Sequence, residues 1–161
     1  MAAQLEVRNT LSDLKETASG GFALAFHVRF TTPSFLFQTY PKDWLDYYSQ
    51  NSLVLSDPIV AWGFENDGAV NWTDLRDSDS AGVLNKAAEF GLKFGATCAT
   101  GANESRSIGS FARADRDFTD AERAMFLEKL EMLHRATTDM KTLSPETAAA
   151  LRTMSVQFTH T

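Results

Sequence analysis

One short segment carries the residue types that recognise a polar group joined to an apolar one. Trp44 and Tyr48 are four residues apart behind Pro41, which places both side chains on one face of a helix. Asp57 follows thirteen residues after Trp44. An ionised carboxylate only accepts hydrogen bonds, an indole N–H only donates and a phenol does both. With Trp72 as a further flat surface, these side chains suit a small polar head group on an apolar tail.

The order and spacing of these residues form a longer pattern. It consists of Trp44, Tyr48, the pair Asp57-Pro58, Trp72 and, after a Gly-Leu step, Gly95. This pattern resembles the autoinducer-binding domain of LuxR-type quorum-sensing regulators, which bind N-acyl-homoserine lactones. The resemblance runs from about residue 22 to about residue 138, most of the chain. It implies a signal receptor in transcription regulation that takes a small-molecule ligand and no cofactor.

The resemblance also implies roles around the head group of such a lactone. Trp44 would donate its indole N–H to the ring carbonyl, and Asp57 would accept from the amide N–H. Tyr48 and Trp72 would form walls on either side.

Two further residues would form hydrogen bonds with the amide carbonyl of the ligand. The resemblance assigns this role to Tyr40 and Ser110, but a shift of two residues in the matching strand would place Ala112 where Ser110 is expected. The tail would lie among residues chosen by strand parity and family position, namely Ser34, Leu36, Val60, Val83, Ala87, Leu92, Thr97 and Ile108.

Each of these residues also has an ordinary structural explanation. Trp44 and Tyr48 alone would be core residues of an amphipathic helix, and Asp57 before a proline would be a helix N-cap. Gly95 alone would mark close packing. Only the joint pattern favours a ligand site, because unrelated caps and core residues have no reason to share all the family's intervals.

Composition limits the classes of function. Fifteen Lys and Arg against 21 Asp and Glu give a net charge of −6 without a basic run, which argues against nucleic-acid binding by this chain alone. A single Cys98 allows no internal disulfide and fits a reducing compartment. The three histidines lack metal-ligand spacing. Without a leader-like start or a membrane-length apolar run, we expect a cytoplasmic protein with no metal and no membrane contact.

Helix and strand patterns occur in blocks. Helices are expected over about 3–15, 41–51, 59–62, 81–90 and 120–140, the last opened by a Thr119–Glu122 capping box, and strands over about 22–30, 34–38, 94–100 and 105–114. This order predicts an α+β domain of the α/β/α sandwich type. The resemblance adds a central antiparallel sheet of about five strands flanked by helices.

The first strand shows the clearest alternation. Its period of two places Phe22, Leu24, Phe26 and Val28 on one face and His27 on the other.

We divide the chain into a sensor domain over residues 1–140 and a C-terminal segment over 141–161. That segment begins with Leu143-Ser144-Pro145-Glu146 and resembles the start of the linker and helix-turn-helix domain that the family joins to its sensor. The rest of that domain is absent from the sequence. We therefore expect a homodimer in which the ligand controls DNA binding through a domain outside this chain.

Two other functions are open at this stage. A shortened member of the family could be a dimerisation module that inhibits a full-length regulator, and exposed apolar positions on the 120–140 helix would indicate this. An enzyme such as a lactone hydrolase is the weakest reading, because the sequence has no metal-ligand cluster and no Gly-x-Ser-x-Gly motif.

Overall fold

The computed structural model describes residues 2–28, 35–102 and 105–137. Its elements in chain order are α1 (Ala2–Thr17), β1 (Gly21–Val28), β2 (Phe35–Gln38), α2 (Lys42–Gln50), the 3₁₀ helix η1 (Leu53–Leu55), α3 (Pro58–Glu65), β3 (Gly68–Asn71), the 3₁₀ helix η2 (Trp72–Ser78), α4 (Val83–Glu89), β4 (Phe94–Ala102), β5 (Ser105–Arg113) and α5 (Asp120–Ala136).

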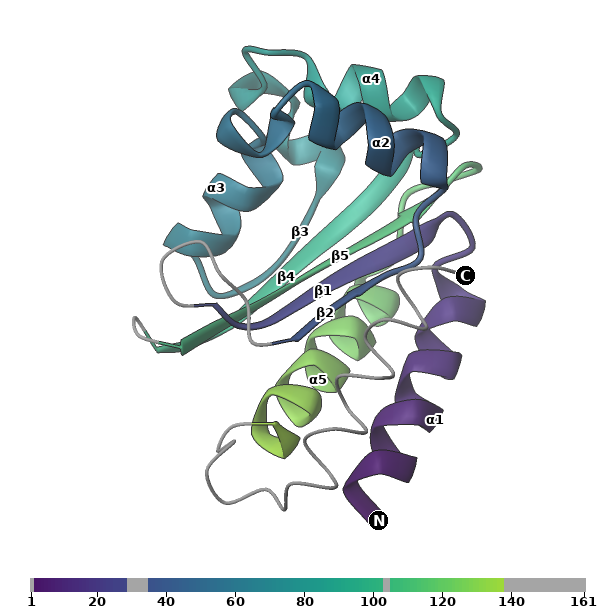
Figure 1. Cartoon of the computed structure of the whole chain (residues 1–161), viewed down its shortest axis with the longest axis vertical. Coiled ribbons are helices and arrows are strands. Elements are labelled where there is room, and N and C mark those ends of the chain that lie inside the picture. The colour runs from purple at the N-terminus through teal and green to yellow at the C-terminus, as the bar shows by residue number, and fades with distance from the viewer. Residues whose placement is uncertain (1, 29–34, 103–104, 138–161) are drawn as a thin grey trace.

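These elements form three layers. The middle layer is a five-stranded sheet with the order β2-β1-β5-β4-β3, and every neighbouring pair is antiparallel. Figure 1 shows α1 and α5 against one face of the sheet and α2, α3 and α4 over the other. The predicted α/β/α sandwich with a five-stranded antiparallel sheet is confirmed.

Local chemistry sets two helix starts as the sequence predicts. Thr119 accepts from the backbone N–H of Glu122, whose carboxylate accepts from the N–H of Thr119, so the capping box opens α5. Asp57 accepts from the N–H of Ile59 at 2.9 Å and caps α3, with Pro58 at its first position. The helix then continues to Glu65, three residues beyond the predicted end at residue 62.

The larger core lies between the sheet and the pair α1 and α5. Phe22, Leu24 and Phe26 of β1 are buried there. Phe111 of β5 stacks on Phe126 of α5 with ring centroids 4.0 Å apart and planes 4° apart. Buried side chains therefore fill the space between this face of the sheet and the two helices.

The predicted alternation of β1 is wrong beyond Phe26. The register between β1 and β5 shifts between Ala25 and Val28, and His27 has a φ of +53°. A bulge of this kind inserts one unpaired residue and reverses the side-chain alternation after it. Val28 therefore lies on the face away from α5, and His27 turns toward α5, where its ring stacks on His134 at 4.3 Å.

The C-terminal segment 141–161 lies outside the described residues. Its resemblance to a linker and helix-turn-helix start therefore stays a prediction. Among the residues whose burial is described, the exposed large apolar side chains are Val54, Leu55 and Phe64. None of these lies on the described part of α5.

Candidate functional site: a cavity over the sheet

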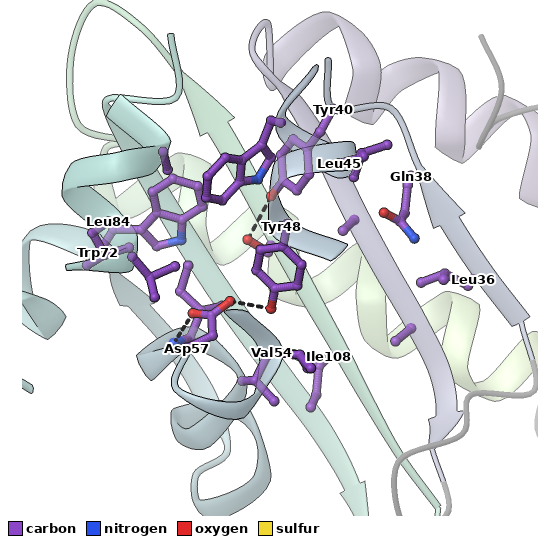
Figure 2. Close-up of a pocket in the computed structure, with 18 of the residues that line it drawn as sticks. Leu36, Gln38, Tyr40, Leu45, Tyr48, Val54, Asp57, Trp72, Leu84 and Ile108 are labelled. Atoms are coloured by element: carbon purple, nitrogen blue, oxygen red, sulfur yellow. Dashed lines mark hydrogen bonds between the residues drawn. The ribbon is translucent and has the colours of Figure 1, made fainter. Parts of the chain in front are cut away.

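A cavity of about 770 Å³ lies between the sheet and the helices α2, α3 and α4. Figure 2 shows residues from β2, α2, η1 and β5 pointing into it. The six residues predicted around a head group all line this space, namely Tyr40, Trp44, Tyr48, Asp57, Trp72 and Ser110. They come from five separate parts of the chain, and the fold brings them together.

The floor of the cavity is a patterned part of the sheet. Strand pairing places Gln38, Ala23, Ser110, Thr97 and Val70 in one row across all five strands, on the same face. The next row is apolar and consists of Leu36, Ala25, Ile108, Ala99 and Gly68. The floor therefore changes from partly polar to apolar within two residues along each strand.

On the other side of the partly polar row, the next row of the sheet consists of glycine and alanine, and the ring of Trp72 lies against it. Gly95 and Gly21 both pair with Ala112. A Cβ atom at Gly95 would overlap the six-membered ring of Trp72, so only glycine lets this ring lie flat against the strand. The indole N–H of Trp72 donates to Thr97 at 3.1 Å and anchors the ring.

Asp57 is the buried acceptor of the site. Its Oδ1 accepts from the N–H of Ile59 at 2.9 Å, and its Oδ2 accepts from the hydroxyl of Tyr48 at 2.7 Å (Figure 2). Only 7% of the residue is exposed. Burial raises the pKa of the Asp57 carboxyl, while the hydrogen bonds from Tyr48 and Ile59 oppose that change.

The two hydroxyls of Tyr40 and Ser110 form a second polar pair. The Tyr40 hydroxyl donates to Ser110 at 2.8 Å, and burial raises the pKa of Tyr40 above its usual value. Because Ser110 accepts from Tyr40, its own hydrogen remains available to another acceptor. Ala112, the alternative position, is fully buried and is not among the residues that line the cavity.

Trp44 belongs to an aromatic cluster that forms the roof. Its ring lies 5.6 Å from Tyr48, 6.1 Å from Tyr47 and 5.4 Å from Phe90. No described residue accepts a hydrogen bond from its indole N–H, although Trp44 is only 5% exposed and lines the cavity. Since Trp44 lines the cavity and an indole N–H can only donate, this N–H is free for an acceptor inside the cavity.

The residues predicted for a tail divide into three groups. Leu36, Val60, Val83, Ala87 and Ile108 line the cavity. Leu92 and Thr97 are buried at 1% and 0% exposure but do not line it, because Leu92 packs in the core beneath α4 and Trp72 covers Thr97. Ser34 lies outside the described residues.

Sequence reasoning missed a set of lining residues. These are Ala23, Ala25, Val28, Gln38, Leu45, Val54, Leu55, Ile59, Phe64 and Leu84. Gln38 lies two residues after Leu36 on the same face of β2, so the alternation that predicts Leu36 also predicts Gln38. Their partners on the neighbouring strand β1 are Ala25 and Ala23. No periodic signal marks η1, which supplies Val54 and Leu55 at 50% and 85% exposure. These two side chains and Phe64 form the rim of the cavity.

Neither a metal centre nor a membrane span is found in the described ranges. No three His, Cys, Asp or Glu side chains gather closely enough to hold a metal ion within residues 2–28, 35–102 and 105–137. None of the helices in those ranges is long and apolar enough to cross a bilayer.

The fold and the cavity define a small sensor-like domain, and comparison with known families identifies it. A sequence model of the autoinducer binding domain matches residues 17–139. The chain therefore belongs to the family of autoinducer-binding domains found in LuxR-type quorum-sensing regulators. These are signal-binding domains of transcription regulators and not a family of enzymes.

One relative supports this assignment by sequence, and a solved structure shares the fold. The HTH-type quorum-sensing regulator RhlR of Pseudomonas aeruginosa is 31% identical over 138 residues, which cover 79% of this chain and 57% of RhlR. Escherichia coli SdiA, solved in complex with octanoyl-rac-glycerol, has a TM-score of 0.62 at 20% identity over 86% of this chain and 63% of that one.

A third relative has the same fold over nearly its whole solved length. CepR2 of Burkholderia cenocepacia, described as an N-acylhomoserine lactone dependent LuxR family transcription factor, has a TM-score of 0.57 at 15% identity, over 88% of this chain and 97% of that one. The present chain spans less than two thirds of RhlR and of the SdiA chain.

Proposed function

We propose that the cavity binds an N-acyl-homoserine lactone. The observation that carries this proposal is the unpartnered indole N–H of Trp44 in the same cavity as the buried carboxylate of Asp57. A ligand that presents a carbonyl and an N–H within a few bonds satisfies both groups, and an acylated amino lactone is such a ligand.

Each polar group of the ligand then has one protein partner. The ring carbonyl accepts from Trp44, and the amide N–H donates to Asp57. The amide carbonyl accepts from Ser110, whose hydroxyl hydrogen is free because Tyr40 supplies the donor of their mutual bond. Tyr48 holds Asp57 in place through its 2.7 Å hydrogen bond, and Trp72 forms a wall beside the ring.

The apolar row of the floor receives the acyl chain. A volume of about 770 Å³ lies within the usual range of small-molecule sites, roughly 300–1,000 Å³. Each buried methylene contributes about 0.8 kcal/mol, whereas a neutral hydrogen bond contributes about 0.5–1.5 kcal/mol. The chain therefore supplies much of the affinity, and the polar groups fix the orientation and reject ligands that leave Asp57 without a donor.

We further propose that this domain acts as part of a regulator. RhlR, of which the chain covers 57%, is an HTH-type regulator, and a DNA-binding domain joined to this sensor would give ligand binding an output. In this proposal the protein is a homodimer, the lactone promotes its assembly, and the reducing cytoplasm is its setting. The proposed role is binding and not catalysis, and the described residues that line the cavity bring no pair of nucleophile and general base together.

The test is mass spectrometry on an organic extract of the purified protein, expressed with and without a mixture of acyl-homoserine lactones, alongside thermal melts. We expect one lactone per chain and a raised melting temperature, because a ligand that binds only the folded state stabilises it by about 2.7 kcal/mol at one hundred times Kd. Recovery of a monoacylglycerol, the type of ligand named for SdiA, would replace the lactone. A protein that retains nothing and melts unchanged would refute the proposal.

A further inference from the structure

The polar row of the cavity floor contains one residue that the head-group assignment does not use. Gln38 lines the cavity and lies at the outer end of this row, on β2. Its side chain is half-buried, and its amide has no hydrogen-bonding partner among the described residues. In Figure 2 the Gln38 amide lies in the part of the cavity bordered by the apolar side chains of Leu36 and Leu45.

Strand pairing fixes the position of Gln38 relative to the head group. Ala23 pairs with Gln38 on one side and with Ser110 on the other, so the two polar residues lie two strands apart, roughly 10 Å at the backbone. Alanine has no side chain beyond Cβ, so the residue between Ser110 and Gln38 in this row leaves room above the strand for a ligand chain. A ligand chain that leaves Ser110 toward β2 passes over Ala23 and meets the Gln38 amide within its first few atoms, before the rest of the chain continues over the apolar row.

From this arrangement we infer that Gln38 is a specificity-determining residue for an oxygen-bearing substituent near the start of the acyl chain. The inference rests on the proposed lactone function and deepens it. A carboxamide offers two N–H donors and one carbonyl acceptor. It can donate to a keto oxygen, and it can both donate to and accept from a hydroxyl. In a substituted acyl-homoserine lactone the oxygen is attached to carbon 3 of the acyl chain, two bonds from the amide carbonyl carbon. In the inferred pose this oxygen lies between Ser110 and Gln38.

An unsubstituted chain would not use this group. It would cover the Gln38 amide with methylenes and remove its contact with water without replacing the hydrogen bonds, which is unfavourable. A site that hydrogen-bonds an oxygen on its ligand rejects the analogue without it more strongly than an apolar site rejects an added oxygen. The preference should therefore be for the substituted chain.

The experiment compares dissociation constants for matched ligands of equal chain length: unsubstituted, 3-oxo and 3-hydroxy acyl-homoserine lactones, each at several lengths. The proteins are the unaltered chain, Gln38→Leu and Gln38→Met. Gln50→Leu is the control, because Gln50 is an exposed glutamine of α2 that does not line the cavity. We expect the unaltered chain and the control to bind a substituted ligand about 3- to 10-fold more tightly than the unsubstituted one, the value of one hydrogen bond.

In the Gln38 variants this preference should disappear, with the unsubstituted ligand bound at least as tightly as before. Gln38→Met keeps an unbranched chain of similar length, so the comparison survives if Gln38→Leu fails to fold. Equal affinities for substituted and unsubstituted ligands in the unaltered chain would overturn the inference while leaving the proposed function intact. So would an equal loss for all ligands in both variants. Binding of no lactone at all would refute the proposed function, and the inference with it.

Discussion

The hydroxyl of Tyr48 donates to Oδ2 of Asp57 at 2.7 Å, and this contact connects the helix α2 to the cap of α3. Since Oδ1 already accepts from Ile59, each carboxylate oxygen holds one donor and keeps one lone pair. The carboxylate is thus fixed in orientation and still able to accept from a ligand N–H. Helix capping and ligand recognition share this one side chain.

Asp57→Asn should weaken lactone binding by about tenfold or more, the value of a hydrogen bond to a charged group. Asparagine has one oxygen, which Tyr48 and Ile59 would share, and its NH₂ would face the N–H of the ligand. Isothermal titration measures the affinity, and urea unfolding measures the stability.

Asp79→Asn is the matched control for this prediction. Asp79 accepts from the backbone N–H groups of Val83 and Leu84 in the first turn of α4, at 2.9 and 2.8 Å, but it does not line the cavity. Each of the two variants removes an acceptor at the start of a helix and should lower the free energy of unfolding by about 1 kcal/mol. Only Asp57→Asn should also lower the affinity for lactone. If the two variants bind lactone equally well, Asp57 is only a helix cap.

Trp44→Phe removes the indole donor and keeps an aromatic ring in the roof. We expect about 2- to 10-fold weaker binding, corresponding to one neutral hydrogen bond, with little change in melting temperature. Trp62→Phe is the control, because Trp62 packs against the same cluster without lining the cavity. Unfolding of Trp44→Phe would show that packing is the main role of Trp44.

Gly95→Ala should displace Trp72, because the added methyl group overlaps its ring. Overpacking of this kind costs about 1–3 kcal/mol, measurable by urea unfolding, and lactone binding should weaken with it. In a Trp72→Ala background the same change should cost much less, since the ring is gone. An equal cost in both backgrounds would show that Gly95 and Trp72 are not coupled.

Acid should destabilise the domain through the histidine pair on the other face of the sheet. Burial lowers the pKa of His134 to about 4, and burial also lowers the pKa of His27. The unfolded chain takes up protons near pH 6.5 while the folded chain resists them. Stability is therefore full above that pH and falls as the pH drops from about 6.5 toward 4.

The comparison with His134→Gln isolates this effect. The raised pKa of Asp57 acts in the opposite direction, but Asp57 is present in both proteins and cancels in their difference. Urea unfolding between pH 7.5 and 4.5 should show a shallower acid loss in the variant. Parallel curves for the two proteins would assign the acid loss to other groups.

Local signals in the sequence predicted most of the fold. The Thr119 capping box and the Asp57-Pro58 cap mark helix starts because their chemistry lies within three residues. The bulge at His27 was not predictable in this way, since a non-glycine residue at positive φ leaves no mark in an alternating strand. Likewise η1 and η2 are too short to show a period.

The family pattern selected the six polar and aromatic residues that line one part of the cavity, but it did not predict their contacts or many of the other lining residues. The family pattern named Trp72 and Gly95, but their close approach depends on how η2 lies on β4. Thr97 has the parity of a cavity residue and is covered by Trp72, which only the tertiary structure reveals. Leu92 lies in the connection between α4 and β4, where no strand alternation predicts which way its side chain points. The ligand roles of all these residues stay predictions until binding is measured.

The most direct test of the lactone site is the indole N–H signal of Trp44 in a ¹H–¹⁵N spectrum. The chain has three tryptophans, and the Trp44→Phe and Trp62→Phe variants assign their signals. Saturation with an acyl-homoserine lactone should move the Trp44 signal downfield as its N–H gains the ring carbonyl, and leave the Trp62 signal in place. An analogue with a cyclopentyl ring, which lacks the carbonyl, should not move it. A bound lactone that leaves the Trp44 signal unchanged would contradict the proposed site.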